Sequence, residues 1–76
     1  MKESLELIIN SLVSDTGAVS INEVEGEKSI VLEVKVASSD MGRVIGKEGR
    51  IAKAIRTIMK SIAAKEGKKV TVEFID

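Results

Sequence analysis

The apolar residues of this chain change their spacing between the period of a helix and that of a strand, and this alternation restricts the possible folds. Near the N-terminus they recur at intervals of three and four, as on one face of a helix of about four turns. They are Leu5, Ile8, Ile9, Leu12 and Val13. We expect this helix to end at residues 15–17, with Gly17 in the left-handed conformation that favours glycine.

Alternating apolar residues predict three strands. Val19 and Ile21 indicate a short first strand, and residues 25–28 read as the turn that follows it. The second strand contains Ile30, Leu32, Val34 and Val36, and the third contains Val70, Val72 and Phe74.

Two helices are expected between the second and third strands. Ser38, Ser39 and Asp40 are residue types that cap helices, and they predict a short helix over residues 40–45 that Gly46 ends. Met41, Val44 and Ile45 would face the core from this helix. The next helix would begin near Arg50 and end at Gly67, with Ile51, Ile55, Ile58 and Ile62 on one face and Lys53, Arg56 and Lys60 on another. This order predicts an α+β fold over residues 1–76, with a three-stranded sheet packed against three helices.

The composition excludes much chemistry. With 76 residues, the chain forms one small domain with a thin core. The absence of Cys and His removes disulfides, thiolate chemistry and the usual metal ligand and general base. No catalytic residue, metal site or cofactor is therefore expected. The N-terminal segment lacks the pattern of a targeting signal, and no apolar run approaches the ~20 residues of a membrane helix, which favours a cytoplasmic protein.

The charges are segregated along the chain, although the formal net charge is zero. Residues 1–42 carry three basic and eight acidic side chains, whereas residues 43–69 carry nine basic and two acidic ones. Local potential, rather than the total charge, attracts an anionic partner. The second half of the chain therefore has the charge of a nucleic-acid-binding surface, although a solvated helix face would show the same distribution.

A short glycine loop opens the basic helix. Gly46-Lys47-Glu48-Gly49 places two residues without a Cβ beside the free N–H groups of a helix start, where phosphate binds readily. Arg50 and Lys53 lie within the first turn of that helix. The loop is not a nucleotide-binding P-loop, since only three residues separate Gly42 from Gly46 and Glu48 stands where Ser or Thr should be. Without its context, the loop would be better explained as a tight connection between two helices.

The segment Val44-Ile45-Gly46-Lys47-Glu48-Gly49-Arg50-Ile51-Ala52-Lys53-Ala54-Ile55 resembles the signature of KH domains, RNA-binding modules with a GXXG loop. The order of elements is similar to the prokaryotic type II arrangement. Over essentially its whole length, the chain is most similar to the small bacterial KH-domain protein A family. Strings such as Val24-Glu25-Gly26-Glu27-Lys28 contribute to this resemblance.

The resemblance implies a non-catalytic protein that holds about four nucleotides of single-stranded RNA. The implied RNA-binding residues are Ile45, Gly46, Lys47, Glu48, Gly49, Arg50 and Lys53, together with Arg43 on the preceding helix. Bases would lie in an apolar groove between the helical pair and the nearest strand. The resemblance further implies a role as an RNA chaperone or post-transcriptional regulator that affects cell-wall growth and cell shape. Glu48 departs from a purely basic loop and would weaken binding if it faced phosphate.

Two alternatives stay open from the sequence. A DNA-reading helix-turn-helix would also join two helices by a glycine turn, but the three strands argue against it. A protein-interaction subunit is the stronger alternative. Relatives of this family are thought to pair with a larger KH-domain protein B, and with themselves, so that the RNA site could be weak or vestigial.

Overall fold

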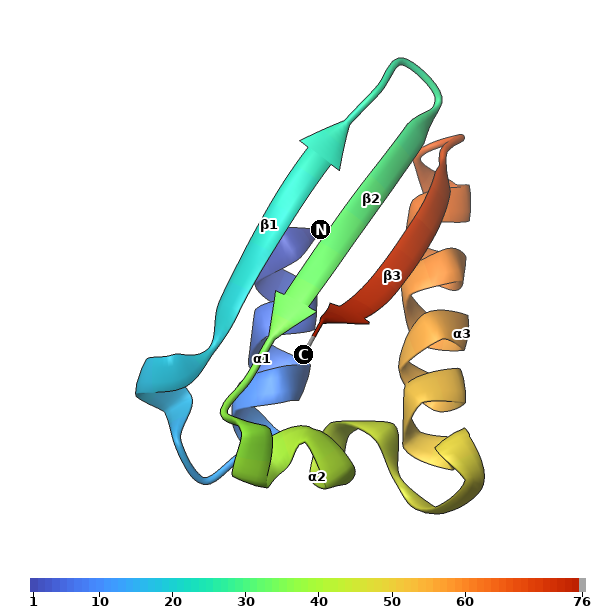
Figure 1. Cartoon of the computed structure of the whole chain (residues 1–76). Helices are drawn as coiled ribbons and strands as arrows, with labels where there is room; N and C mark the ends of the chain where they lie inside the picture. The colour runs from blue at the N-terminus through green and yellow to red at the C-terminus, as the bar shows by residue number, and fades with distance from the viewer. Residues whose placement is uncertain (76) are drawn as a thin grey trace.

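The computed structural model describes residues 1–75 and has three helices on one face of a three-stranded sheet (Figure 1). The elements are α1 (Lys2–Leu12), β1 (Ser20–Glu25), β2 (Ser29–Lys35), α2 (Met41–Ile45), α3 (Arg50–Lys65) and β3 (Lys69–Ile75). One-turn 3-10 helices at Thr16–Ala18, Ser38–Asp40 and Lys47–Gly49 complete the order. This arrangement confirms the predicted α+β class and is that of a type II KH fold.

The sheet has the order β1-β2-β3. The β1–β2 pair is antiparallel and is joined by a tight turn in which the Gly26 N–H donates to the Ser29 carbonyl at 2.7 Å. The β2–β3 pair is parallel, with Leu32 opposite Val72. Parallel neighbours need a long connection across the sheet, and α2 and α3 supply it. As a result, β3 is an edge strand that runs beside α3 (Figure 1).

The core lies between the helices and one face of the sheet. Alternate residues of the strands point into it, as the period of two requires. Its buried apolar residues are Leu5, Ile9, Ile21, Ile30, Leu32, Val34, Val44, Ala52, Ile55, Met59, Ala63, Val70 and Val72. Val44 of α2 is fully buried, whereas Met41 and Ile45 are half-buried and pack against the rim of this cluster.

The buried face of α3 differs from the predicted isoleucine face. Ala52, Ile55, Met59 and Ala63 form its centre, while Ile51 and Ile62 are only half-buried. Ile58, on the same predicted face, is 46% exposed. The buried face of α3 therefore includes two small alanines, Ala52 and Ala63.

The predicted end of α1 is also wrong. The helix ends at Leu12, and Val13 is already extended. Gly17 does not adopt positive φ and lies in the short 3-10 helix instead. The cause is tertiary: Asp40 accepts hydrogen bonds from the backbone N–H groups of Ser14 and Asp15, both at 3.0 Å, and holds this segment away from a helical path.

Asp40 has this role in place of the predicted helix cap. No side-chain hydrogen bond caps α2. The side chain is 2% exposed, and its Oδ1 lies 3.9 Å from Nε of Arg43. The two N–H groups of residues 14 and 15 and, to a lesser extent, Arg43 hold the pKa of Asp40 below its ordinary value of 3.8.

None of the helices described in residues 1–75 is long and apolar enough to cross a membrane.

Replacing Asp40 by Asn should lower the melting temperature by several degrees, because the amide can accept only one of the two N–H bonds well. Since the folded pKa is depressed, ionised Asp40 stabilises the fold above its unfolded pKa near 3.8, and this contribution is lost as the pH falls through the folded value. The difference between wild type and Asp40→Asn should therefore shrink below about pH 4. Thermal unfolding monitored by circular dichroism from neutral to acidic pH measures this difference, with exposed Glu23→Gln as the control. A constant difference across this range would contradict the assignment.

Candidate nucleic-acid interface

The Gly46–Gly49 segment forms a compact turn between α2 and α3. Gly46 ends α2 with φ 77° and ψ 172°, and its N–H donates to the Gly42 carbonyl at 2.9 Å. Glu48 and Gly49 are both left-handed, with φ 59° and 73°. Arg50 returns to helical geometry at φ −63° and begins α3. The turn thus consists largely of backbone conformations that side chains disfavour.

Different constraints favour glycine at positions 46 and 49. A Cβ on Gly46 would lie 2.6 Å from Cγ1 and 2.9 Å from the backbone N of Ile51, closer than atoms can approach. A Cβ on Gly49 would meet nothing within 4 Å, so only its positive φ favours glycine. Gly46 therefore allows the turn to close onto α3, whereas Gly49 leaves the outer side of the turn open.

This geometry leaves backbone donors available at the start of α3. Within residues 1–75, the N–H groups of Lys47 and Glu48 donate no hydrogen bond. They lie at the N-terminus of a 16-residue helix, whose dipole adds a partial positive charge. Such a turn can bind an oxyanion through its backbone.

Charged side chains surround these donors. Lys47, Arg50 and Lys53 are all exposed and lie on the turn and the first part of α3. Glu48 extends into solvent with Oε2 3.7 Å from Nη2 of Arg50, and the two side chains are 74% and 81% exposed. An exposed pair of this kind is weak and does not fix either side chain. An incoming phosphate can therefore compete for Arg50.

The turn does not include all the residues that the sequence suggested. Arg43 donates to the Ser14 hydroxyl and lies beside Asp40, so its guanidinium is drawn toward the end of α1. Ile45 is half-buried and packs against the core cluster. The other six residues of the prediction lie on the turn or in the first turn of α3, and they make up the candidate site: Gly46, Lys47, Glu48, Gly49, Arg50 and Lys53.

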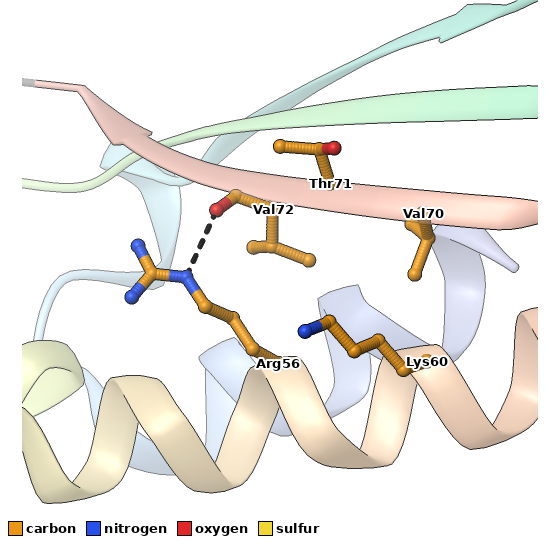
Figure 2. A pocket seen from close by; sticks show the side chains of 5 residues that line it. All are labelled: Arg56, Lys60, Val70, Thr71 and Val72. Carbon is orange, nitrogen blue, oxygen red and sulfur yellow. Dashed lines mark hydrogen bonds between the residues drawn. The ribbon is translucent and has the colours of Figure 1, made fainter.

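A cleft between α3 and β3 lies further along the same helix (Figure 2). It encloses about 170 Å³ and is lined by Arg56, Lys60, Val70, Thr71 and Val72. Arg56 Nε donates to the Val72 carbonyl at 3.2 Å, and its guanidinium carbon lies 5.3 Å from the centroid of the Phe74 ring. Figure 2 shows Arg56 reaching from the helix to the Val72 carbonyl, while Lys60 extends along the helix on the side of Arg56.

The cleft lies between a helix and the adjacent strand, where the resemblance implies an apolar groove, and its walls are basic as well as apolar. The sequence contained a signal for this: Arg50, Lys53, Arg56 and Lys60 recur at three- and four-residue intervals, which places them along one side of a helix. The spacing of these residues does not predict that Arg56 reaches the free edge of β3, because the position of β3 depends on the whole fold.

In the described part of the chain, no group of three or more acidic side chains is placed to hold a metal ion.

Gly46→Ala should destabilise the protein more than Gly49→Ala. The strained backbone at Gly46 costs about 1–3 kcal/mol for a non-glycine residue, and the overlap with Ile51 adds to it. Gly49→Ala should cost only about 1–2 kcal/mol, since its left-handed conformation is the sole penalty. Urea unfolding of the two single variants measures the difference. Equal decreases in the free energy of unfolding would show that the approach to Ile51 is unimportant.

The family model described as KhpA/KhpB, KH domain, matches residues 2–74. The RNA-binding protein KhpA of Clostridium perfringens is 61% identical over 75 residues, which cover 99% of this chain and 100% of that protein. The protein of the same name from Clostridium acetobutylicum is 60% identical with the same coverage.

A relative of lower sequence identity has the same name. The RNA-binding protein KhpA of Aquifex aeolicus is 43% identical over 76 residues, which cover 100% of this chain and 96% of that protein. No solved structure gave a significant match. The family is defined by a KH domain and not by an enzymatic activity. With a family model that spans nearly the whole chain and relatives this similar, the chain belongs to the KhpA/KhpB family of KH domains.

Proposed function

We propose that this protein binds single-stranded RNA at the Gly46–Gly49 turn. The observation that carries the proposal is the pair of unbonded backbone N–H groups at Lys47 and Glu48, which lie at the N-terminus of α3. Its relatives are named as RNA-binding proteins, which supports RNA as the ligand. The turn takes one or two phosphates through its backbone, and Lys47, Arg50 and Lys53 add charge-assisted contacts.

The mechanism is binding without chemistry. A phosphate displaces Glu48 from Arg50, whose planar guanidinium can bind two phosphate oxygens at once. Lys47 supplies a mobile charge from the outer side of the turn. Single strands have exposed bases that can enter the cleft beside α3, whereas a paired helix keeps its bases stacked inside. The small number of phosphate contacts predicts weak binding with a salt slope of roughly −2 to −3.

Glu48 limits the affinity of this site. Its carboxylate is solvent-exposed, so water and salt screen much of its repulsion toward phosphate. Its left-handed backbone is a further cost, since glutamate adopts this conformation less readily than glycine. A ligand that is held weakly can be exchanged quickly, which suits an RNA chaperone or a post-transcriptional regulator.

The remaining parts of the proposal rest on the resemblance to the family. They are a cytoplasmic location, a partnership with a larger KH-domain protein B or with a second copy, and effects on cell-wall growth and cell shape. A second weak RNA site on a partner would raise the overall affinity by avidity.

The double variant Lys47→Asp, Glu48→Asp should weaken RNA binding by at least about ten-fold, with a salt slope reduced by about 0.7 for each phosphate that it no longer binds. Binding of a labelled single-stranded RNA, measured by gel shift at two salt concentrations, tests this. Lys2→Asp changes the net charge equally on exposed α1 and is the matched control. Glu48→Gln should instead bind more tightly, because it removes the repulsive charge and frees Arg50. A folded double variant with wild-type affinity and slope would rule out the turn as the RNA site.

A protein-interaction subunit is the second candidate function, and exposed apolar side chains favour it. Leu7 on α1, Val24 on β1 and Ile58 on α3 are 71%, 55% and 46% exposed. Val24 lies on the face of the sheet that the helices do not cover, opposite Val31. Such side chains contribute to interfaces when a partner covers them.

Light scattering after size-exclusion chromatography should separate the two functions. If association is the main function, the mass without RNA should approach twice the 8.2 kDa of one chain, and Ile58→Lys or Val24→Lys should return it to the monomer value. Bound RNA should raise the measured mass of the protein only by the mass of the RNA itself. A monomer at all concentrations would contradict self-association as the function.

A further inference from the structure

One face of the sheet is not covered by the helices, and we call it the open face (Figure 1). Buried residues alternate along each strand, so the residues between them point to the open face. The register of the strands arranges these residues in rows across the sheet. From one end to the other, the rows are Ser20, Lys35 and Ile75, then Asn22, Glu33 and Glu73, then Val24, Val31 and Thr71, and last Gly26, Ser29 and Lys69.

The rows of the open face differ in charge. The second row is acidic through Glu33 and Glu73, and the last row is basic through Lys69. The uncharged row between them contains Val24, which is 55% exposed, and the half-buried Val31. Glu33, Glu73 and Lys69 make no ion pair within residues 1–75. An apolar row therefore separates opposite charges that have no ionic partner in the described chain.

Glu73 and Lys69 are too far apart to pair with each other. They lie on the same strand, on either side of Thr71, and are separated by about 13 Å along it. Both side chains are exposed. Their charges are therefore available to a partner that presents the opposite charges at the same spacing.

A second copy of this chain has those charges at that spacing. Two open faces can meet with their strands antiparallel, about a two-fold axis that follows the row of Val24 and Val31. Each strand then faces the same strand of the second copy, and Val24 and Val31 face their own counterparts. Glu73 faces Lys69 of the second copy, and the two-fold axis repeats this pair. Packed sheets keep their strand directions within about 30°, so the facing residues stay close.

The opposite alignment of the two sheets is disfavoured by charge. With the strands parallel, the row of Asn22, Glu33 and Glu73 would face the same row of the second copy. Like charges that face each other across an interface oppose association. The charges of the open face therefore select the antiparallel orientation.

The shape of the open face agrees with this orientation. A hollow of about 280 Å³ lies at the end of the sheet where β1 begins, and it is lined by Ser20, Asn22, Glu33, Lys35 and Ile75. The β1–β2 turn, which contains the exposed Glu27, lies at the opposite end of the sheet (Figure 1). In the antiparallel arrangement the turn of the second copy lies over the hollow, with its Glu27 beside Lys35.

From these observations we infer that the open face is an interface between two copies of this chain, paired antiparallel about the row of Val24, Val31 and Thr71. This inference rests on the proposed subunit function and is independent of RNA binding. Exposed ion pairs contribute little, and the apolar row is narrow. The dimer is therefore weak and forms at high protein concentration.

Charge reversal tests the pairing of Glu73 with Lys69. Glu73→Lys and Lys69→Glu should each weaken association at least about ten-fold, since each change creates two pairs of like charges in the dimer. The double variant Glu73→Lys, Lys69→Glu should associate like wild type, and an equimolar mixture of the two single variants should also dimerise. Sedimentation equilibrium at increasing protein concentration measures this, without RNA because Lys69 also borders the gap beside α3. Glu6→Lys and Lys2→Glu, on exposed positions of α1, are the matched controls.

Three results would count against the inference. Single variants that associate like wild type, or a double variant as weak as the singles, would overturn it. A dimer that Ile58→Lys disrupts and Val24→Lys does not would place the interface on α3, which overturns the inference and leaves the subunit function intact. A wild type that stays monomeric up to millimolar concentration would overturn the inference and self-association together, whereas RNA binding at the glycine turn is tested separately by gel shift.

Discussion

The close approach of the Gly46 backbone to Ile51 is the interaction from which the site follows. It brings the end of α2 against the start of α3, and a side chain at residue 46 would occupy the same space as Ile51. Because the Gly46 backbone lies against Ile51, the chain reverses direction through the left-handed conformations of Glu48 and Gly49. The same reversal leaves the N–H groups of Lys47 and Glu48 without internal partners. Packing of the helical pair and exposure of the anion site are therefore two results of one constraint.

The buried Asp40 performs a comparable task at the other end of α2. It joins the segment after α1 to the start of α2 by two hydrogen bonds, and so places the helical pair relative to the N-terminal helix. Its charge is acceptable in a buried position because backbone donors and Arg43 compensate it. Arg43 is consequently tied to structure, whereas Arg50, Lys53, Arg56 and Lys60 remain along α3. The positive surface of the molecule is thus concentrated on one helix and the adjoining edge of β3.

Much of the fold could be predicted because local patterns and tertiary packing agree. The alternation of Ile30, Leu32 and Val34 indicated β2, and these residues are buried on one face. The predictions failed where a distant residue decided the outcome. Gly17 does not take its expected conformation, because a carboxylate more than twenty residues away binds the backbone just before it. Ile58 is exposed because the buried face of α3 is instead made of Ala52, Ile55, Met59 and Ala63. A reading of apolar spacing gives more weight to isoleucine than to a small alanine.

Residue type and spacing are sufficient to establish the order of elements, the glycine turn at the head of a basic helix, and the resemblance to KH domains. These features depend on interactions that act over a few residues. The folded arrangement is needed to show that Arg43 faces Ser14, that Arg56 reaches the Val72 carbonyl, and that Lys60 and Lys69 line one cleft. Such contacts join elements far apart in the chain. Their geometry follows from the parallel pairing of β3 with β2, which no local pattern contains.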